Sequence, residues 1–186
     1  MGEVVSELEP FFELELPDDW VLSPATRELG GPAIQLELEY TRRPDVTFAN
    51  HTADGFETEW YNVSTTISLW WYAADNEYVI EGPAMVEHCT ADAETAEHKL
   101  REAMGVTRSH AERRWIGLAC RNVDGIGPVT VQRLHEEYGQ LERILDASPT
   151  RLKTIPNVTG DAISEVRRQF KLNGDDQEQL TEWASS

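Results

Sequence analysis

Apolar and polar residues alternate along the first part of the chain, as they do in strands with one buried face. In IQLELEY, residues 34–40, apolar side chains fall at every second position, and FELEL, residues 12–16, alternates in the same way. TTISLWWY, residues 65–72, is too apolar for a strand with a wet face, which predicts a central strand. Residues 77–89 predict a further strand, interrupted at Gly82-Pro83 by a bulge or an edge turn.

A helix is expected directly after these strands. Thr90 is a suitable N-cap, Lys99 and Arg101 would lie in the last turn, and Gly105 would follow the helix end. One face of this helix is apolar and is expected to pack on the sheet: Ala93, Ala96, Leu100 and Ala103. Residues 1–108 are therefore predicted to form an α+β domain, an antiparallel sheet with one packed helix.

The spacing of apolar residues changes to that of helices after residue 108. GVTRSH, residues 105–110, is expected to join two domains, and Ser109-x-x-Glu112 forms a capping box before a short helix. After the loop VDGIGP, apolar residues recur at i, i+3 and i+7 of a second helix: Val131, Leu134 and Tyr138. A helical turn at Leu141–Leu145 and a short helix starting at Ser148-Pro149 follow.

Residues 109–171 contain an internal repeat. When this segment is shifted by 32 residues it superimposes on itself, and five apolar positions coincide: Val123 with Ile155, Ile126 with Val158, Val131 with Ile163, Leu134 with Val166, and Tyr138 with Phe170. The basic residue before each loop recurs as well, Arg121 with Lys153. Two copies of one helix–loop–helix unit would therefore share a single all-α core.

The stretch VDGIGPVTVQRL…LERILDASPTRLKTIPNVTGDAI resembles a tandem helix-hairpin-helix domain of DNA repair and recombination proteins. The resemblance covers about residues 110–171. It implies that each hairpin, of the form apolar-x-Gly-apolar-Gly, joins two helices. It also implies that the amides of the hairpin and of the following helix contact a phosphate of the DNA backbone.

The chemistry of the first hairpin agrees with that use. Glycine at positions 125 and 127 permits unusual backbone angles and leaves no side chain in the way of an approaching oxygen. Pro128 suits the first helical position, and the N–H groups after it can attract an anion without net positive charge. The residues expected to contact DNA phosphate are Arg121, Gly125, Ile126, Gly127, Val129, Thr130 and Arg133. Such contacts position a duplex without reading its sequence.

The second hairpin, IPNVTGD, departs from the pattern. Asn157 and Thr159 occupy the glycine positions, and asparagine accepts a left-handed backbone better than threonine does. Asp161 adds a negative charge at the next helix start. This copy is expected to keep the fold and to contact phosphate more weakly, through Asn157, Gly160, Arg167 and Arg168.

Charge is unevenly distributed along the chain, which has a formal net charge of −18. Residues 1–108 carry 22 acidic and 6 basic residues, whereas residues 109–171 carry 8 acidic and 10 basic ones; residues 172–186 form an acidic tail. Acidity with few lysines suggests a halophilic protein from a salt-rich cytoplasm, where a Debye length of about 3 Å screens repulsion. We expect a cytoplasmic protein, because no apolar run approaches about 18 residues and no signal pattern begins the chain.

Signs of an enzyme in residues 1–108 are weak. Glu97-His98-Lys99 matches the E-x-K end of a nuclease motif, with Asp45 or Asp18 as its beginning, but a helix would make these side chains diverge. Asp54, Glu57 and Glu59 beside His51 could together bind a divalent metal ion, but such acidic clusters arise freely in so acidic a chain. Trp60, Tyr61, Trp70, Trp71 and Tyr72 offer either a stacking surface for single strands or, more simply, core packing.

The sequence therefore predicts a non-catalytic protein that binds the DNA backbone without sequence preference, in repair, recombination or chromosome maintenance. We expect no resident metal or organic cofactor. The sequence leaves open whether the first hairpin binds a monovalent cation. An alternative is an adaptor or homodimer whose helical module docks a protein without touching DNA. A divalent-metal nuclease in the first domain ranks third.

Overall fold

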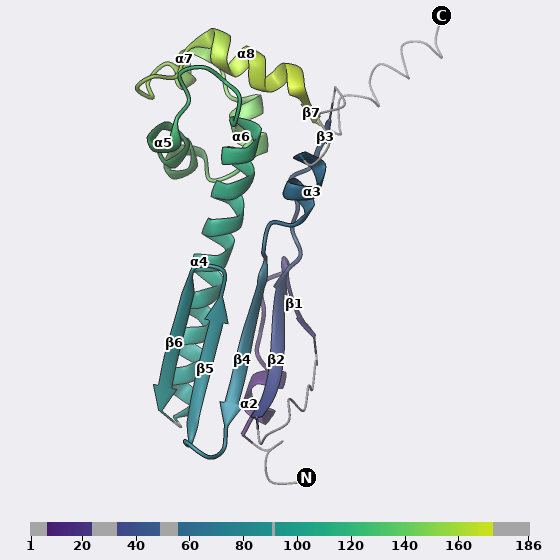
Figure 1. Cartoon of the computed structure of the whole chain (residues 1–186), viewed down its shortest axis with the longest axis vertical. Coiled ribbons are helices and arrows are strands. Elements are labelled where there is room, and N and C mark those ends of the chain that lie inside the picture. The colour runs from purple at the N-terminus through teal and green to yellow at the C-terminus, as the bar shows by residue number, and fades with distance from the viewer. Residues whose placement is uncertain (1–6, 24–32, 49–55, 91, 173–186) are drawn as a thin grey trace, which may run out of the picture. The chain divides into compact units, whose positions relative to one another are not determined.

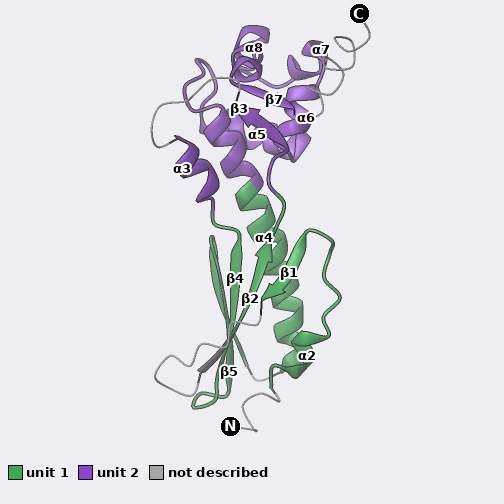
Figure 2. Ribbon diagram, turned by 90° about the vertical axis from the view of Figure 1, so that its right-hand side faces the viewer, with its two compact units in different colours: residues 1–42, 64–111 green, residues 43–63, 112–186 purple. Residues whose placement is uncertain are grey.

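The structure is a computed structural model that describes residues 7–23, 33–48, 56–90 and 92–172; the acidic tail beyond Leu172, His51 and Asp54 lie outside the described residues. The chain divides into two compact units (Figure 2). The sheet unit comprises residues 1–42 and 64–111, and the helical unit comprises residues 43–63 and 112–186. The expected domains, 1–108 and 109–171, differ from these units chiefly in the segment 43–63, which is grouped with the helices.

The sheet unit is built on five antiparallel strands in the order β1-β2-β4-β5-β6 (Figure 1). Their bounds are β1 Trp20–Ser23, β2 Ala33–Tyr40, β4 Thr66–Tyr72, β5 Glu77–Gly82 and β6 Met85–Thr90. The predicted central strand is confirmed, since β4 pairs with β2 on one side and β5 on the other. The interruption at Gly82-Pro83 is a turn between two paired strands, β5 and β6.

Helices α2 (Glu9–Phe12) and α4 (Ala93–Ala119) cover one face of this sheet (Figure 1). The predicted apolar stripe of α4 is buried at Ala96, Leu100 and Ala103 and half-buried at Ala93. Thr107 Oγ1 lies so near Gly82 that a Cβ added there would stand 3.1 Å away. Phe11 of α2 meets the Tyr78 ring edge-on, with ring centroids 5.4 Å apart.

Two local predictions in the sheet unit are wrong. Residues 12–16 form no strand: Phe12 ends the helical turn α2, whose second residue is Pro10, and Phe11 is buried while Phe12 is exposed. Thr90 ends β6 rather than capping the helix. Asp92 caps it instead, accepting hydrogen bonds from the Glu94 and Thr95 amides. A bond from the Thr95 hydroxyl lowers the pKa of the Asp92 carboxyl, with smaller help from those amides.

The helix expected to stop at Gly105 runs on to Ala119, so the predicted helix end and the capping box at Ser109 are wrong. The boundary between the two units follows Ala111, one residue beyond the predicted junction at residues 105–110. Burial explains the continuation: Thr107, Ala111 and Glu112 are buried, whereas Gly105 and Ser109 are exposed. One interior glycine costs a helix about 1 kcal/mol, which burial of those side chains offsets. Glu112 has no capping role inside the helix.

Within its described residues, the helical unit contains five further helices and a two-stranded sheet. Their bounds are β3 Val46–Phe48, α3 Phe56–Tyr61, α5 Pro128–Tyr138, α6 Leu141–Asp146, α7 Pro149–Leu152, α8 Gly160–Gln169 and β7 Phe170–Leu172. The predicted turn at Leu141–Leu145 is α6, and Ser148 caps α7 by accepting from the Arg151 amide. The α+β class is thus confirmed, with the antiparallel sheet first and helices after it.

Segment 43–63 is held to the helices by aromatic packing that the sequence did not predict. β3 pairs antiparallel with β7, placing Phe48 opposite Phe170. The Phe170 ring stacks on Trp60 of α3 with ring centroids 5.4 Å apart. The Trp115 indole N–H donates to the Trp60 carbonyl at 3.2 Å. Trp60 and Trp115 are therefore core residues.

Both cysteines are expected to resist alkylation in the native protein. Cys89 and Cys120 are buried and free. Burial raises the pKa of the Cys120 thiol to about 12 and also raises that of Cys89. Since the thiolate is the reactive form, a thiol reagent at pH 8 should label neither cysteine before unfolding and both afterwards. Rapid labelling of either one in the folded protein would contradict this burial.

Candidate nucleic-acid interface

The first hairpin, residues 123–127, makes a tight turn before α5. Gly125 has a φ of 85°, in the left-handed region, while Gly127 is extended with φ −98°. The Ile126 amide donates to the Val123 carbonyl at 3.2 Å, and the Ile126 side chain is 8% exposed. The apolar residue is thus anchored in the core while the glycines on either side face outward.

The second hairpin repeats this geometry. Asn157 has a φ of 68°, matching Gly125, and Thr159 is extended with φ −100°, matching Gly127. Four backbone hydrogen bonds recur 32 residues later; for example, the Val158 amide donates to the Ile155 carbonyl at 3.1 Å. Of the five predicted apolar pairs, only the one at Val131 includes a residue that is not fully buried.

The sequence-based reason for doubting the second hairpin is therefore wrong in one respect. Only the first glycine position requires a left-handed backbone, and asparagine adopts it there. Thr159 stands where any residue fits, and its hydroxyl accepts a hydrogen bond from the Ala162 amide at 3.1 Å. Threonine caps the helix rather than straining the turn.

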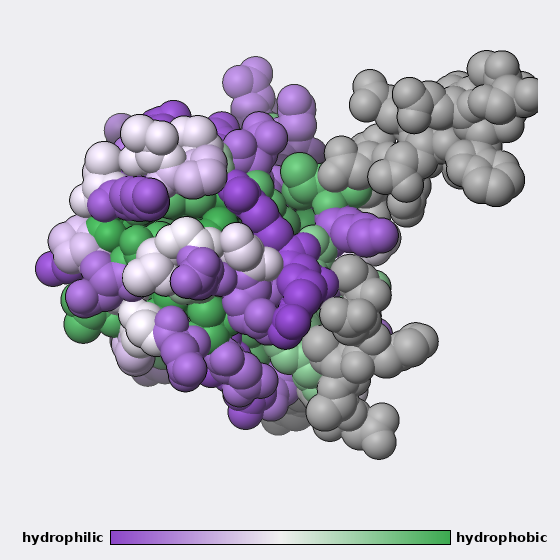
Figure 3. Space-filling view, turned by 90° about the horizontal axis from the view of Figure 1, so that it is seen from above, coloured by the Kyte–Doolittle hydropathy of each residue, from purple (hydrophilic) through white to green (hydrophobic). Residues whose placement is uncertain are grey.

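The two hairpins lie side by side. A Cβ added to Gly125 would stand 3.7 Å from the Asn157 carbonyl oxygen, an ordinary contact distance. Figure 3 looks down on Figure 1 from the side of α7 and α8, where white residues of intermediate hydropathy lie among purple hydrophilic ones. Two equivalent turns thus meet at their left-handed residues.

This geometry agrees with the comparison against protein families. Residues 120–171 match the family model described as a SAM-like helix-hairpin-helix tandem. This segment is a tandem helix-hairpin-helix domain. The rest of the chain has no family match, and neither a curated protein nor a solved structure matches the chain. A domain of this family supports interaction with nucleic acid.

The two hairpins of the helix-hairpin-helix domain differ at their helix starts. Gly127 has no side chain to cap α5, and Pro128 has no N–H. The first intrahelical donor is the Val131 amide, which donates to Gly127 O at 3.0 Å, so the N–H groups of Val129 and Thr130 have no acceptor in the helix. In the second hairpin the Thr159 hydroxyl already accepts from an amide of α8. The first hairpin therefore leaves more backbone amides without a side-chain cap than the second does.

The side chains near the first hairpin lie in different environments. Val129 is 66% exposed, whereas Thr130 is 3% exposed. The Thr130 hydroxyl is therefore not presented to a ligand, and that residue can contribute only its backbone N–H. Arg133, on α5, is exposed. Asp124, within the turn, is exposed as well and places a negative charge beside the amides.

Arg121, which precedes the first hairpin, is held by a carboxylate that sequence reasoning did not connect with it. Its Nη1 lies 2.8 Å from both carboxylate oxygens of Glu59, on α3. Glu59 was considered only as part of an acidic cluster for metal. Nothing local in the sequence pairs two residues 62 positions apart, and only the packing of segment 43–63 brings them together.

The arginines expected to support the second hairpin have other contacts. The Arg167 guanidinium donates to the carbonyls of Leu145 and Ala147 at the end of α6, so it stabilises the helix connection. Arg168 is exposed and forms an ion pair with Glu165 at 2.7 Å. Asn157 is exposed, and Gly160 begins α8 with a half-buried backbone. Of this set, Arg168 and Asn157 face solvent most openly.

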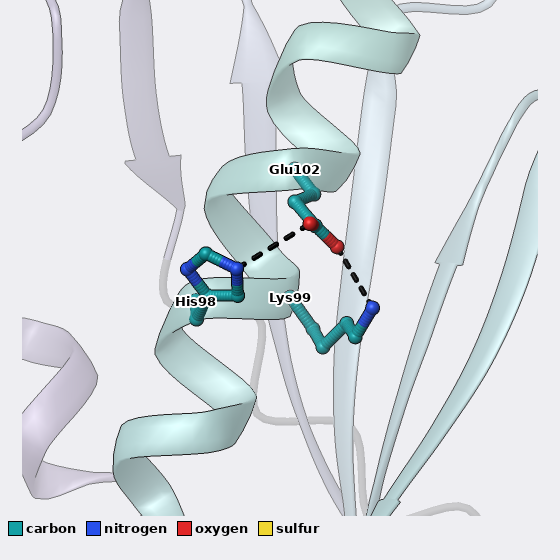
Figure 4. A network of polar contacts seen from close by, with 3 residues as sticks. All are labelled: His98, Lys99 and Glu102. Carbon is teal, nitrogen blue, oxygen red and sulfur yellow. Dashed lines mark hydrogen bonds and ion pairs between the residues drawn. The ribbon is translucent and has the colours of Figure 1, made fainter.

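Glu97 and Lys99, which end the nuclease-like motif, have different partners on α4. On α4, Lys99 bonds to Glu102 at 2.8 Å, and His98 lies 3.4 Å from the same carboxylate (Figure 4). Glu97 instead pairs with Arg101 at 2.9 Å, so Glu97 and Lys99 have separate partners. Across the described residues, no three His, Cys, Asp or Glu side chains group as metal ligands, and no helix is long and apolar enough to cross a membrane.

The left-handed backbone of Gly125 gives a prediction about stability. Gly125→Ala is expected to destabilise the protein by about 1–2 kcal/mol, because alanine is strained at positive φ. Gly125→Asn should cost less, since Asn157 adopts the same conformation in the second hairpin. Urea unfolding followed by circular dichroism measures both; equal losses would show that backbone strain is not the cause.

Proposed function

We propose that the tandem helix-hairpin-helix domain binds the sugar–phosphate backbone of DNA, mainly through its first hairpin. The observation that carries the proposal is the uncapped start of α5, where two N–H groups lack an acceptor beside exposed glycines. A phosphate oxygen satisfies such amides, and the helix dipole adds to the attraction. Arg133 and, once released from Glu59, Arg121 supply positive charge on either side.

Binding of this kind is independent of sequence, because amides at a hairpin reach phosphate oxygens rather than base edges. The second hairpin contributes less, through Asn157 and Arg168, since the start of α8 is capped by Thr159. With few basic side chains, affinity rests on oriented amides more than on released counterions. That property suits a salt-rich cytoplasm, which the acidic composition suggests.

The biological role that fits is non-catalytic: a backbone-binding component of DNA repair, recombination or chromosome maintenance. The resemblance of the repeat to domains of such proteins supports this role, as does the separation of Glu97 from Lys99 in the only nuclease-like motif described. A monovalent cation at the first hairpin remains an open part of the proposal.

Fluorescence anisotropy tests the proposal directly. Labelled duplexes of unrelated sequence, titrated with the full chain at several KCl concentrations, should bind with equal affinity. The slope of log K against log [KCl] should be shallow, reflecting a few phosphate contacts at about 0.9 each. Absence of binding at every salt concentration, or strong preference for one sequence, would contradict the proposal.

One observation favours the alternative that the domain docks a protein. Val129, at the exposed start of α5, is 66% exposed, and an apolar side chain gains nothing from a phosphate. Val129→Ser separates the two functions, because it keeps the backbone amide and removes the apolar contact. Unchanged DNA affinity in this variant supports backbone binding, whereas loss of a partner without loss of DNA affinity supports docking.

Glu59 is expected to weaken DNA binding by competing for Arg121. Glu59→Gln should raise duplex affinity about two- to fivefold, the size of an exposed ion pair, and steepen the salt slope by about 0.9. Glu57→Gln on the same helix removes the same charge without touching that ion pair, and is the matched control. If both variants raise affinity equally, the effect is one of net charge rather than of the pairing with Arg121.

A further inference from the structure

The face of the sheet that α2 and α4 leave open is turned toward the viewer in Figure 1. The strand register places its side chains in rows across the sheet. One row consists of Gln35, Trp70, Val79 and His88. The adjacent row consists of Glu37, Ser68, Glu81 and Val86. Rings, carboxylates and apolar side chains are therefore interleaved on one surface, called here the open face.

Hydrogen bonding on the open face leaves acceptors in excess. The Gln35 amide nitrogen donates to Glu37 Oε1 at 3.0 Å and to Ser68 Oγ at 2.9 Å, which uses both of its N–H groups. The Gln35 Oε1 atom is buried and finds no donor among the described residues. The Trp70 indole donates to Glu81 at 3.2 Å. The N–H donors of Gln35 and Trp70 are thus used by acceptors of the same face.

Charge on the open face has one sign. Among the described strand positions that point to it are four carboxylates, those of Glu37, Glu39, Glu77 and Glu81, and no lysine or arginine. His88 bonds to Glu77 at 3.1 Å. The half-buried rings of Trp70 and Tyr72 lie 6.3 Å apart and add the negative faces of their π systems. Val86, 60% exposed, adds an apolar contact.

We propose that the open face binds a basic segment of a partner protein, one in which arginine side chains alternate with apolar ones. Guanidinium groups supply the donors that the face lacks and match its carboxylates bidentately. They also stack on indole and phenol rings. An extended segment with apolar residues between the arginines would cover Val86. Nucleic acid and anionic membranes carry the wrong charge, and a second copy facing this one would oppose carboxylate to carboxylate.

The test uses the full chain labelled with ¹⁵N at its tryptophan indoles. Its probe is a synthetic peptide of alternating arginine and valine, compared with the same peptide carrying citrulline, which keeps the shape and removes the charge. The arginine peptide should shift the Trp70 indole resonance, assigned with Trp70→Phe, and the citrulline peptide should not. Anisotropy of the labelled peptide gives the affinity.

Matched variants separate a specific site from general acidity. Glu37→Gln with Glu81→Gln should weaken peptide binding at least about tenfold. Glu9→Gln with Glu13→Gln removes the same charge from exposed positions on and after α2, away from the open face, and should leave binding within about twofold. All four positions are exposed or half-buried, and near-ultraviolet circular dichroism checks the fold.

Three results would overturn the proposal: no binding of the arginine peptide, equal weakening by the two double variants, or shifts confined to other indoles. Analytical ultracentrifugation, which measures the oligomeric state, can give a fourth contradicting result. If the chain dimerises and Glu37→Gln with Glu81→Gln abolishes the dimer, the open face pairs with a second copy instead. None of these outcomes depends on the helix-hairpin-helix domain, so this proposal stands or falls separately from DNA binding.

Discussion

Gly127→Asp is expected to weaken duplex binding at least about tenfold, equivalent to about 1.4 kcal/mol, without loss of fold. The new carboxylate would stand at the cap of α5, where a phosphate oxygen is proposed to bind, and would occupy the same amides. Its cost to the fold is small because Gly127 has an extended backbone and a Cβ there meets nothing within 4 Å. Aspartate is also a favourable N-cap, so the melting temperature should hold or rise.

Gly127→Thr is the matched control, because it copies Thr159 of the second hairpin. Threonine caps the helix without charge, so it should reduce affinity less than aspartate does while leaving stability similar. Anisotropy titrations and thermal melts of the three proteins give both quantities. Affinity unchanged by aspartate would mean that the first hairpin does not contact DNA; a large fall in melting temperature would mean that the turn needs glycine for its fold.

The sequence predicted the helical repeat well because its signals are local. Positions 32 residues apart bury equivalent side chains, and the hydrogen bonds of the two turns agree. Glycine at 125 has the unusual backbone angle that the sequence predicts, with φ in the left-handed region. At 127 the reason was different: the structure needs only an extended residue there, and the value of glycine is that it leaves the amides of α5 uncapped.

What the sequence could not predict depends on contacts between distant segments. The capping box at Ser109 is a sound local signal for a helix start. The helix α4 nevertheless continues past Ser109, because Thr107 and Ala111 are buried in its interior face. The strand expected at residues 12–16 has the right alternation, but Phe12 ends the helical turn α2 and the residues after it belong to no strand. The Glu59–Arg121 pair was missed for the same reason, because the packing of α3 on the helical unit has no sequence signature.

The chemistry of the two units points to opposite partners. The open face of the sheet unit is made of acceptors and rings, whereas the start of α5 offers donors. If both proposals hold, the chain is an adaptor that binds an anionic backbone with its helical unit and a basic protein segment with its sheet unit. The acidic composition then has a local function on the sheet in addition to any role in salt tolerance.

Trp115→Ala is expected to be the most destabilising of the substitutions considered, at about 3–5 kcal/mol. Trp115 has no exposed surface, donates its indole N–H to the Trp60 carbonyl, and lies under the Arg43 guanidinium at 5.5 Å. Alanine would leave a cavity where segment 43–63 packs on the helices, and would leave a carbonyl without its donor. Proteins of this size have unfolding free energies of about 5–15 kcal/mol. The substitution would therefore remove a large part of the stability of the helical unit.

Two comparisons identify the cause of the Trp115→Ala effect. Trp115→Phe keeps much of the packing and loses the indole donor, so it should cost about 1–2 kcal/mol. Hydrogen exchange should show faster opening of amides in α5 and α8, with amides of β4 and β5 in the sheet unit changed less. Urea unfolding measures the total. A loss below about 1 kcal/mol for alanine, or equal acceleration of exchange in both units, would show that Trp115 does not anchor segment 43–63 to the helical unit.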